Sequence, residues 1–162
     1  MSSIINALVE EHRRFCAEFD HIEQVLSKTR EVKELKRLAC VMEDMLLPHA
    51  AAEEDLLLFA LDHGGAGQRP SLSRVHRDHQ EIDAELTQVK LTATPARARR
   101  LLRAAMESSR LHFQHEESAV FPMIKRLMAP EVLSRLGAMW VRKGQKSAVT
   151  TRGAGVRWQK SE

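Results

Sequence analysis

The chain has 162 residues, which suits one domain with a sizeable core, and its 43% apolar and 29% charged content is typical of soluble globular proteins. No apolar run is long enough to span a bilayer, and two cysteines are too few for a disulfide scaffold, so we expect a cytoplasmic protein with free thiols. The absence of tyrosine excludes mechanisms that need a tyrosine ligand or radical, and the low Gly and Pro content favours helices over strands.

Apolar residues in the first half of the chain recur at alternating steps of three and four, which predicts two amphipathic helices. The first helix should begin after an N-cap at Ser2 or Ser3, and its apolar seam ends at Leu26. The second should run from about residue 31 to residue 63, where a glycine-rich segment stops it. We expect Pro48 to bend this second helix.

The second half of the chain repeats the same pattern. A third helix opens at Pro70 and has an apolar seam up to Val89, and a fourth opens at Thr94, an N-cap followed by proline at the first helical position. We expect Pro122 to kink the fourth helix. Four helices with short connections predict an all-α fold, an antiparallel up-down-up-down four-helix bundle.

A short fifth helix should start at Pro130 and end at about Trp140, and a basic tail follows it. Residues 141–162 hold six Lys or Arg and one Glu, a net charge of +5, whereas residues 1–140 hold 19 basic and 21 acidic side chains. We therefore expect residues 1–140 to form the bundle and residues 141–162 a flexible, solvated tail. A weak contact of this tail with nucleic acid or an acidic membrane surface is the alternative interpretation.

Polar residues interrupt the four apolar seams, and they form a repeat. HAAAEED begins at His49 and HFQHEES begins at His112, so each motif has a His and, four residues later, the first of two glutamates. On the preceding helix each motif has a matching pair of an acid and a His, at 11–12 and at 78–79. The chain is therefore predicted to contain two similar helical hairpins that face each other. The seam residues in question are His12, His49, Glu53, His79, His112 and Glu116.

This pattern indicates a metal site. A His and a Glu four residues apart lie on one face of a helix, so each pair can point to a common centre. Burying two carboxylates without positive partners costs on the order of several kcal/mol each, and no Lys or Arg occupies the neighbouring seam positions. Imidazole and carboxylate ligands suit iron, manganese or zinc. Four His and two Glu indicate two metal ions; we expect iron, with manganese or zinc as alternatives.

Over about residues 3–128 the sequence resembles the hemerythrin-like HHE cation-binding family. The resemblance depends on the two His-x3-Glu-Glu motifs, the acid–His pair before each of them, and Phe121-Pro122 after the second. It implies a non-heme di-iron centre with oxo and carboxylate bridges that binds small diatomic molecules or peroxide. By position it implies His12, His49, His79 and His112 as terminal ligands, and Glu53 and Glu116 as bridges.

Four further residues have alternative roles. Glu116 and Glu117 compete for one bridging position, because the family closes its second motif with an acid five residues after the His. Glu54 and Glu117 could instead hold a ligand imidazole through its other nitrogen. His76, one turn from His79, is a candidate for a fifth His ligand, and His115 is a second candidate for such a role.

We expect the centre to bind O2, NO or peroxide for sensing, storage or defence against oxidative and nitrosative stress. One alternative is an enzyme that decomposes hydrogen peroxide or reduces NO, with a redox partner that the sequence does not identify and a nearby acid or base that moves protons. Another is an iron donor for the repair of iron centres. A bundle without metal would leave two carboxylates buried beside neutral imidazoles.

Overall fold

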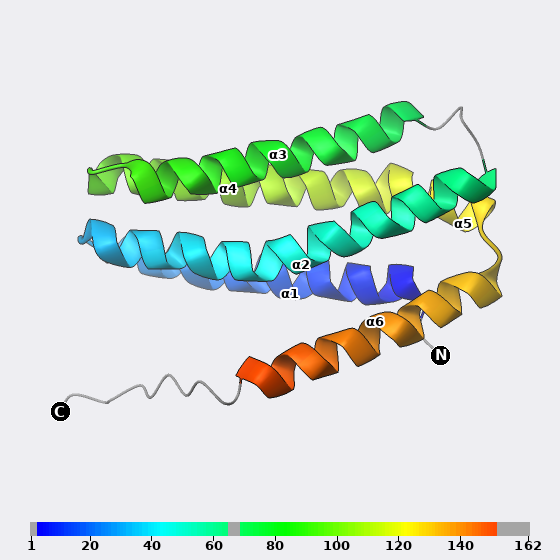
Figure 1. The fold of residues 1–162 in the computed structure, drawn as a ribbon. Helices are drawn as coiled ribbons and strands as arrows, with labels where there is room; N and C mark the ends of the chain where they lie inside the picture. The colour runs from blue at the N-terminus through cyan, green and yellow to red at the C-terminus, as the bar shows by residue number, and fades with distance from the viewer. Residues whose placement is uncertain (1–2, 65–68, 152–162) are drawn as a thin grey trace.

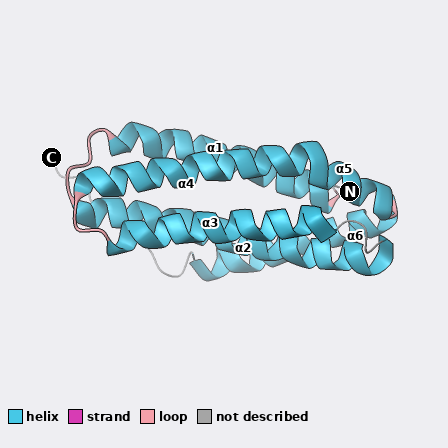
Figure 2. Cartoon of the chain, turned by 90° about the horizontal axis from the view of Figure 1, so that it is seen from above, coloured by secondary structure: helices cyan, strands magenta, loops and turns pink. Residues whose placement is uncertain are grey.

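Helices make up nearly all of the chain in the computed structural model, which describes residues 3–64 and 69–151 (Figures 1 and 2). Within these residues there is no strand, so the prediction of an all-α helical bundle is confirmed. The elements are α1 (Ile4–Leu26), α2 (Val32–Gly64), α3 (Arg69–Leu91), α4 (Pro95–His115), the π-helix η2 (Glu116–Val120), α5 (Phe121–Leu127) and α6 (Pro130–Thr151).

The four long helices α1 to α4 lie side by side, and the colour gradient in Figure 1 runs in opposite directions along successive helices. Helix α3 contacts α4 and α2, and α1 contacts α2, α4 and α6. The predicted caps are found at Ser3, whose hydroxyl accepts a hydrogen bond from the backbone N–H of Asn6 at 3.2 Å, and at Thr94, which precedes Pro95 with an extended backbone but without a side-chain cap bond.

The buried face of α1 is the one that the spacing predicts. Its apolar seam packs inward because a step of three or four residues returns to the same side of the helix. The buried residues of α1 are Ile4, Ile5, Leu8, His12, Phe15, Phe19, Ile22 and Leu26.

A buried polar layer divides the core into two apolar clusters. On α1, Leu8 belongs to one cluster and Phe15 to the other, and His12 lies between them with 2% of its surface exposed. The same division is found on α2, where Leu46 and Leu56 belong to different clusters. Because apolar packing holds the helices together on both sides, the polar layer has fixed walls above and below.

The helix geometry around Pro122 differs from a simple kink. Helix α4 passes into the π-helix η2 at Glu116, and α5 then begins at Phe121. Proline has no N–H, so the α-helical hydrogen bond to the carbonyl of Ser118 cannot form, and a wider turn before Pro122 accommodates the missing bond. In contrast, α2 continues through Pro48 as one helix.

Helix α6 is longer than the sequence suggested. It continues past Trp140 to Thr151, because residues 141–151 contain no proline and positive charge near a helix C-terminus is not a stop signal. Its Leu133 is buried, and Trp140 packs against the same apolar cluster. Residues 152–162 of the expected tail lie outside the described residues. Among the helices described, none combines the length and hydropathy that a membrane span requires.

Candidate metal centre

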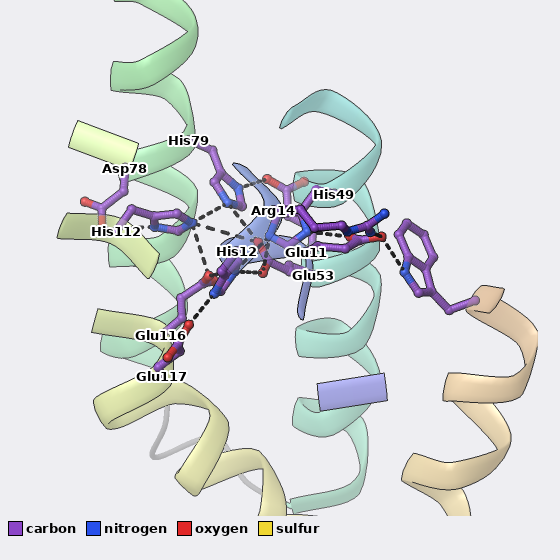
Figure 3. Close-up of polar contacts among 12 residues, drawn as sticks. Glu11, His12, Arg14, His49, Glu53, Asp78, His79, His112, Glu116 and Glu117 are labelled. Atoms are coloured by element: carbon purple, nitrogen blue, oxygen red, sulfur yellow. Dashed lines mark hydrogen bonds and ion pairs between the residues drawn. The ribbon is translucent and has the colours of Figure 1, made fainter. Parts of the chain in front are cut away.

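All six predicted seam residues meet in the polar layer (Figure 3). They form two overlapping groups, and within each group one possible ligand atom from every residue lies within 4.8 Å of the others. Both groups contain the two glutamates. The first group is His12, His49, Glu53 and Glu116, and the second is Glu53, His79, His112 and Glu116.

Five elements contribute to the centre, and most of its side chains are fully buried. Helix α2 supplies both His49 and Glu53, and η2 supplies Glu116 directly after α4 has supplied His112. The two glutamates are 1% and 0% exposed. The side chain of His79 on α3 is the most accessible of the six, at 11%.

The Nε2 atoms of the four imidazoles point into the centre. Those of His12 and His49 are 2.9 Å apart, and those of His79 and His112 are also 2.9 Å apart. Glu53 lies between the pairs, because its Oε1 is 2.9 Å from His49 Nε2 and its Oε2 is 3.4 Å from His79 Nε2. One carboxylate therefore faces both pairs of nitrogens.

Each imidazole has an acidic side chain beside its other nitrogen, Nδ1. Three of these contacts have hydrogen-bond length, whereas Asp78 makes none with His112. An N–H directed at a carboxylate fixes the tautomer and leaves the Nε2 lone pair free for a metal. The distances are 2.9 Å for His12–Glu117, 2.9 Å for His49–Glu11, 3.2 Å for His79–Glu54 and 3.5 Å for His112–Asp78.

The roles of Glu11 and Asp78 were missed in the sequence, although both were noted as part of the repeat. Each stands beside a histidine in the chain but contacts the histidine of the next helix. Consecutive residues point about 100° apart around a helix, so Glu11 cannot share the inward direction of His12 and faces α2 instead. The repeat of an acid directly before each His was the available signal.

The structure separates the two competing glutamates. Glu116 lies in the centre with no exposed surface, whereas Glu117 is 42% exposed and lies against His12 Nδ1. Glu116 is therefore the one that belongs to both groups. The π-helix begins at this residue, and the two consecutive carboxylates point in different directions, one into the centre and the other to its periphery.

His76 and His115 lie outside both groups. The side chain of His76 is 60% exposed, and its ring nitrogens contact Glu54 Oε1 at 3.1 Å and Gln80 Nε2 at 3.0 Å. His76 is thus a partner of the carboxylate that holds His79. Burial and then the charge of Arg74 lower the pKa of His115.

The shifted pKa values in the metal-free centre indicate that its carboxylates favour positive charge beside them. Burial lowers the pKa of His12, but the surrounding carboxylates of Glu116, Glu53 and Glu117 outweigh it and raise the pKa to about 10. Burial likewise opposes protonation of His49, yet Glu53 and Glu11 raise its pKa to about 9. Burial, and then the charge of Glu53, raise the pKa of Glu116 to about 7. Among the described residues, every ion-pair partner of the two central glutamates is a histidine.

The central oxygens fit a metal because three of them lack a hydrogen bond to any described residue, although histidine nitrogens lie nearby. Glu53 Oε2 and both oxygens of Glu116 are buried and accept no hydrogen bond within the described residues. Buried polar atoms of this kind are rare in folded proteins, and coordination to a cation would satisfy them. Four imidazole nitrogens and two shared carboxylates provide the ligand types that divalent transition metals prefer.

A cavity of about 270 Å³ lies between α2, α3 and α4 and reaches the centre. Its wall includes His49, His79 and His112, and most of the remaining wall is apolar. The exposed residues Ala51 and Gln80 also line it, so it opens to the surface. Of the described residues in its wall, none is Lys or Arg.

Comparison with protein families gives a direct match. The hemerythrin HHE cation binding domain matches residues 3–124, and a second match covers residues 72–142. The searches of curated proteins and of solved structures found no match. The first family match covers most of the chain, including all six residues of the centre. The chain belongs to the hemerythrin HHE cation-binding domain family.

Proposed function

We propose that the centre holds two iron ions as a non-heme di-iron site that binds O2, NO or peroxide, for sensing, storage or stress defence. The observation that carries the proposal is the sharing of Glu53 and Glu116 by two groups of possible ligands. Two metal ions are favoured over one, because the possible ligand atoms gather in two groups of four rather than in one group of six. Each pair would hold one ion, and the two carboxylates would bridge them.

The ligand set favours iron and an open coordination position. A structural zinc ion takes four protein ligands and leaves no vacancy, whereas two imidazoles and two shared carboxylates leave room for an exogenous ligand on a metal that accepts five or six. When bound, two iron ions would supply those open positions and a reversible change of oxidation state. Manganese and zinc are the alternatives that metal analysis must exclude.

The cavity supports a small, uncharged ligand. Its apolar wall of residues such as Ile82, Leu86 and Phe113 offers no cation to an anionic ligand, and Glu54 and Asp83 add negative charge at its edge. O2, NO and hydrogen peroxide are neutral and small enough for a space of about 270 Å³. Phe113 and the apolar wall would also limit the access of water to the bound ligand.

The first test is the metal content of protein purified without added iron. The proposal predicts about two iron ions per chain and the absorption of an oxo-bridged ferric pair. The reduced protein, mixed with O2 or NO in a stopped-flow instrument, should form a stable spectroscopic adduct. Protein that contains no transition metal, and takes up none from ferrous iron under anaerobic conditions, would refute the proposal.

Peroxide decomposition is a second candidate, and one contact favours it. His76 lies at the surface and contacts Glu54, which also contacts Nδ1 of His79 at 3.2 Å. This chain of hydrogen bonds could carry protons between solvent and the centre while two hydrogen peroxide molecules form one O2 and two waters. Sustained O2 evolution that falls in a His76→Ala variant with unchanged iron content would support this function. A stable adduct without O2 evolution would exclude it.

A further inference from the structure

The sequence repeat relates two halves of the centre: the first half contains His12 and His49, and the second half contains His79 and His112. Among the described residues, a hydrogen bond from α6 reaches an acid of the first half. In the first half, His49 is held by Glu11, and in the second half, His112 has Asp78 at the equivalent place. The repeat predicts equal surroundings for these two acids. The structure shows that their surroundings differ.

Glu11 is held by three donors. Its Oε2 accepts from Nδ1 of His49 at 2.9 Å, while its Oε1 accepts from Nε1 of Trp140 at 3.1 Å and from Nη2 of Arg14 at 3.2 Å (Figure 3). Trp140 lies on α6, 129 residues away in the chain, and its ring packs against the apolar cluster below the centre. Both oxygens of Glu11 are therefore fixed, and its carboxylate has little freedom to turn away from His49.

Asp78 lacks comparable support. Its Oδ2 lies 3.5 Å from His112 Nδ1, without a hydrogen bond, and 3.8 Å from Nε of Arg74. Among the described residues, Glu54 lies at the other Nδ1 of the second half, 3.2 Å from that of His79, and Glu117 has the equivalent place in the first half, 2.9 Å from Nδ1 of His12. Both glutamates are 42% exposed, so the main difference between the halves lies at Glu11 and Asp78. A carboxylate without an aligned hydrogen bond restricts an imidazole less than one whose two oxygens are both held by donors.

Burial differs in the same direction. The side chain of His79 is 11% exposed, whereas those of His12, His49 and His112 are 2%, 3% and 2% exposed, so the difference lies at one imidazole of the second half. The cavity is lined by His79 and His112 of the second half, and by His49 alone from the first. The second half is thus closer to solvent and to incoming ligands.

We propose that Trp140 is a positioning residue for the metal position formed by His12, His49, Glu53 and Glu116, and that this position binds its ion more tightly than the one formed with His79 and His112. The inference rests on the proposed two-metal function. Trp140 acts through Glu11, which holds His49 in the orientation that a metal needs, so less freedom is lost when the ion binds. The two positions then fill in order, and the second, looser position is the one beside the cavity.

The test is a titration of the metal-free full-length protein with Co²⁺, a divalent ion with visible absorption, under anaerobic conditions. The wild type should bind two ions with clearly unequal dissociation constants. In Trp140→Phe, which keeps the aromatic packing but lacks the N–H, the tighter constant should weaken roughly three- to tenfold. Glu11→Gln should weaken it by about 10- to 100-fold. In both variants the weaker constant should stay unchanged.

Asp78→Asn is the matched control, because it alters the equivalent place in the other half. It should affect the weaker constant and leave the tighter one unchanged. In a His79→Gln background only the first position remains complete. If Trp140→Phe also weakens the dissociation constant measured in that background, the effect is assigned to the first position. Circular dichroism of the metal-free variants checks that the helical content is retained.

Three results would overturn the inference. They are equal constants in the wild type, an unchanged tighter constant in Trp140→Phe, and an equal loss at both positions, which would indicate general loosening of α6. These outcomes still involve two bound ions, so they leave the proposed function standing. A wild-type protein that binds no Co²⁺ and no ferrous iron would instead refute the proposed function.

Discussion

Replacing Glu116 with glutamine should have opposite effects on the metal-free and the metal-loaded protein. The side chain is fully buried, and burial together with the charge of Glu53 raises its pKa from 4.5 to about 7. When the pKa of an acid is higher in the folded than in the unfolded state, the folded protein loses stability as the pH rises from the unfolded-state pKa to the folded-state pKa. The loss is complete above the folded-state pKa. Glutamine has nearly the same shape and no charge, so it removes this loss.

The size of the effect follows from the two pKa values. A difference between 4.5 and about 7 corresponds to about 3 kcal/mol of destabilisation when Glu116 is ionised. At pH 8.5 and with a chelator present, Glu116→Gln should therefore unfold at a temperature roughly 6–12 °C above the wild type. At pH 4 the carboxyl is protonated in both states, and the two proteins should unfold at similar temperatures.

With metal present the sign should reverse. Glutamine cannot bridge two cations as a carboxylate does, so the loaded variant should bind less metal and gain less stability from it than the wild type. Thermal unfolding followed by circular dichroism, with chelator and with ferrous iron under anaerobic conditions, measures both effects. A metal-free variant that is less stable than the wild type at pH 8.5 would refute the electrostatic reasoning. An undiminished gain from iron would refute the role of Glu116 as a ligand.

Three further predictions concern metal, protons and access. The double variant His49→Leu, His112→Leu should purify without iron, as elemental analysis would show, and should unfold at a lower temperature than the loaded wild type; an unchanged iron content would contradict the ligand assignment. At pH 7 the raised pKa values of His12 and His49, about 10 and about 9, keep both rings protonated in the metal-free protein. Binding of the first ion should thus release protons from both rings, with a further contribution from Glu116, and the release should vanish as the pH rises above about 10, which a pH-stat titration can follow. Ala50→Leu should narrow the cavity and slow the binding of NO to the loaded protein in stopped-flow measurements while the iron content stays constant; an unchanged rate would indicate another route of entry.

The helices and the inward residues could be predicted because both depend on local spacing. Steps of three and four residues determine which side of a helix faces the core, and on α1 every predicted seam residue is buried. The same spacing placed His12 among apolar neighbours and paired His49 with Glu53. No knowledge of the partner helix was needed for these predictions, since the exclusion of apolar surface from water acts on each helix separately.

The contacts between the histidine Nδ1 atoms and the surrounding carboxylates could not be predicted in the same way. They depend on how neighbouring helices are rotated relative to one another. Glu11 contacts His49 and Glu117 contacts His12, and neither pair lies on one helix. The π-helix also alters the register after His112, so counting in α-helical steps does not decide between Glu116 and Glu117. Trp140 directly precedes the segment whose charge suggested a tail, and the docking of α6 on α1 brings it to Glu11.

The polar layer also explains why histidine and glutamate are used without lysine or arginine. A buried arginine would neutralise a central glutamate permanently and occupy its oxygens, leaving no place for a second cation. An imidazolium neutralises the same oxygen in the metal-free protein but can lose its proton and become a ligand. The neighbouring glutamates raise the pKa of His12 to about 10, so a cation that binds at its Nε2 near neutral pH must displace a proton from this ring. The apolar clusters on both sides would keep the layer in place during such an exchange, so we expect metal to enter a folded bundle rather than an unfolded chain.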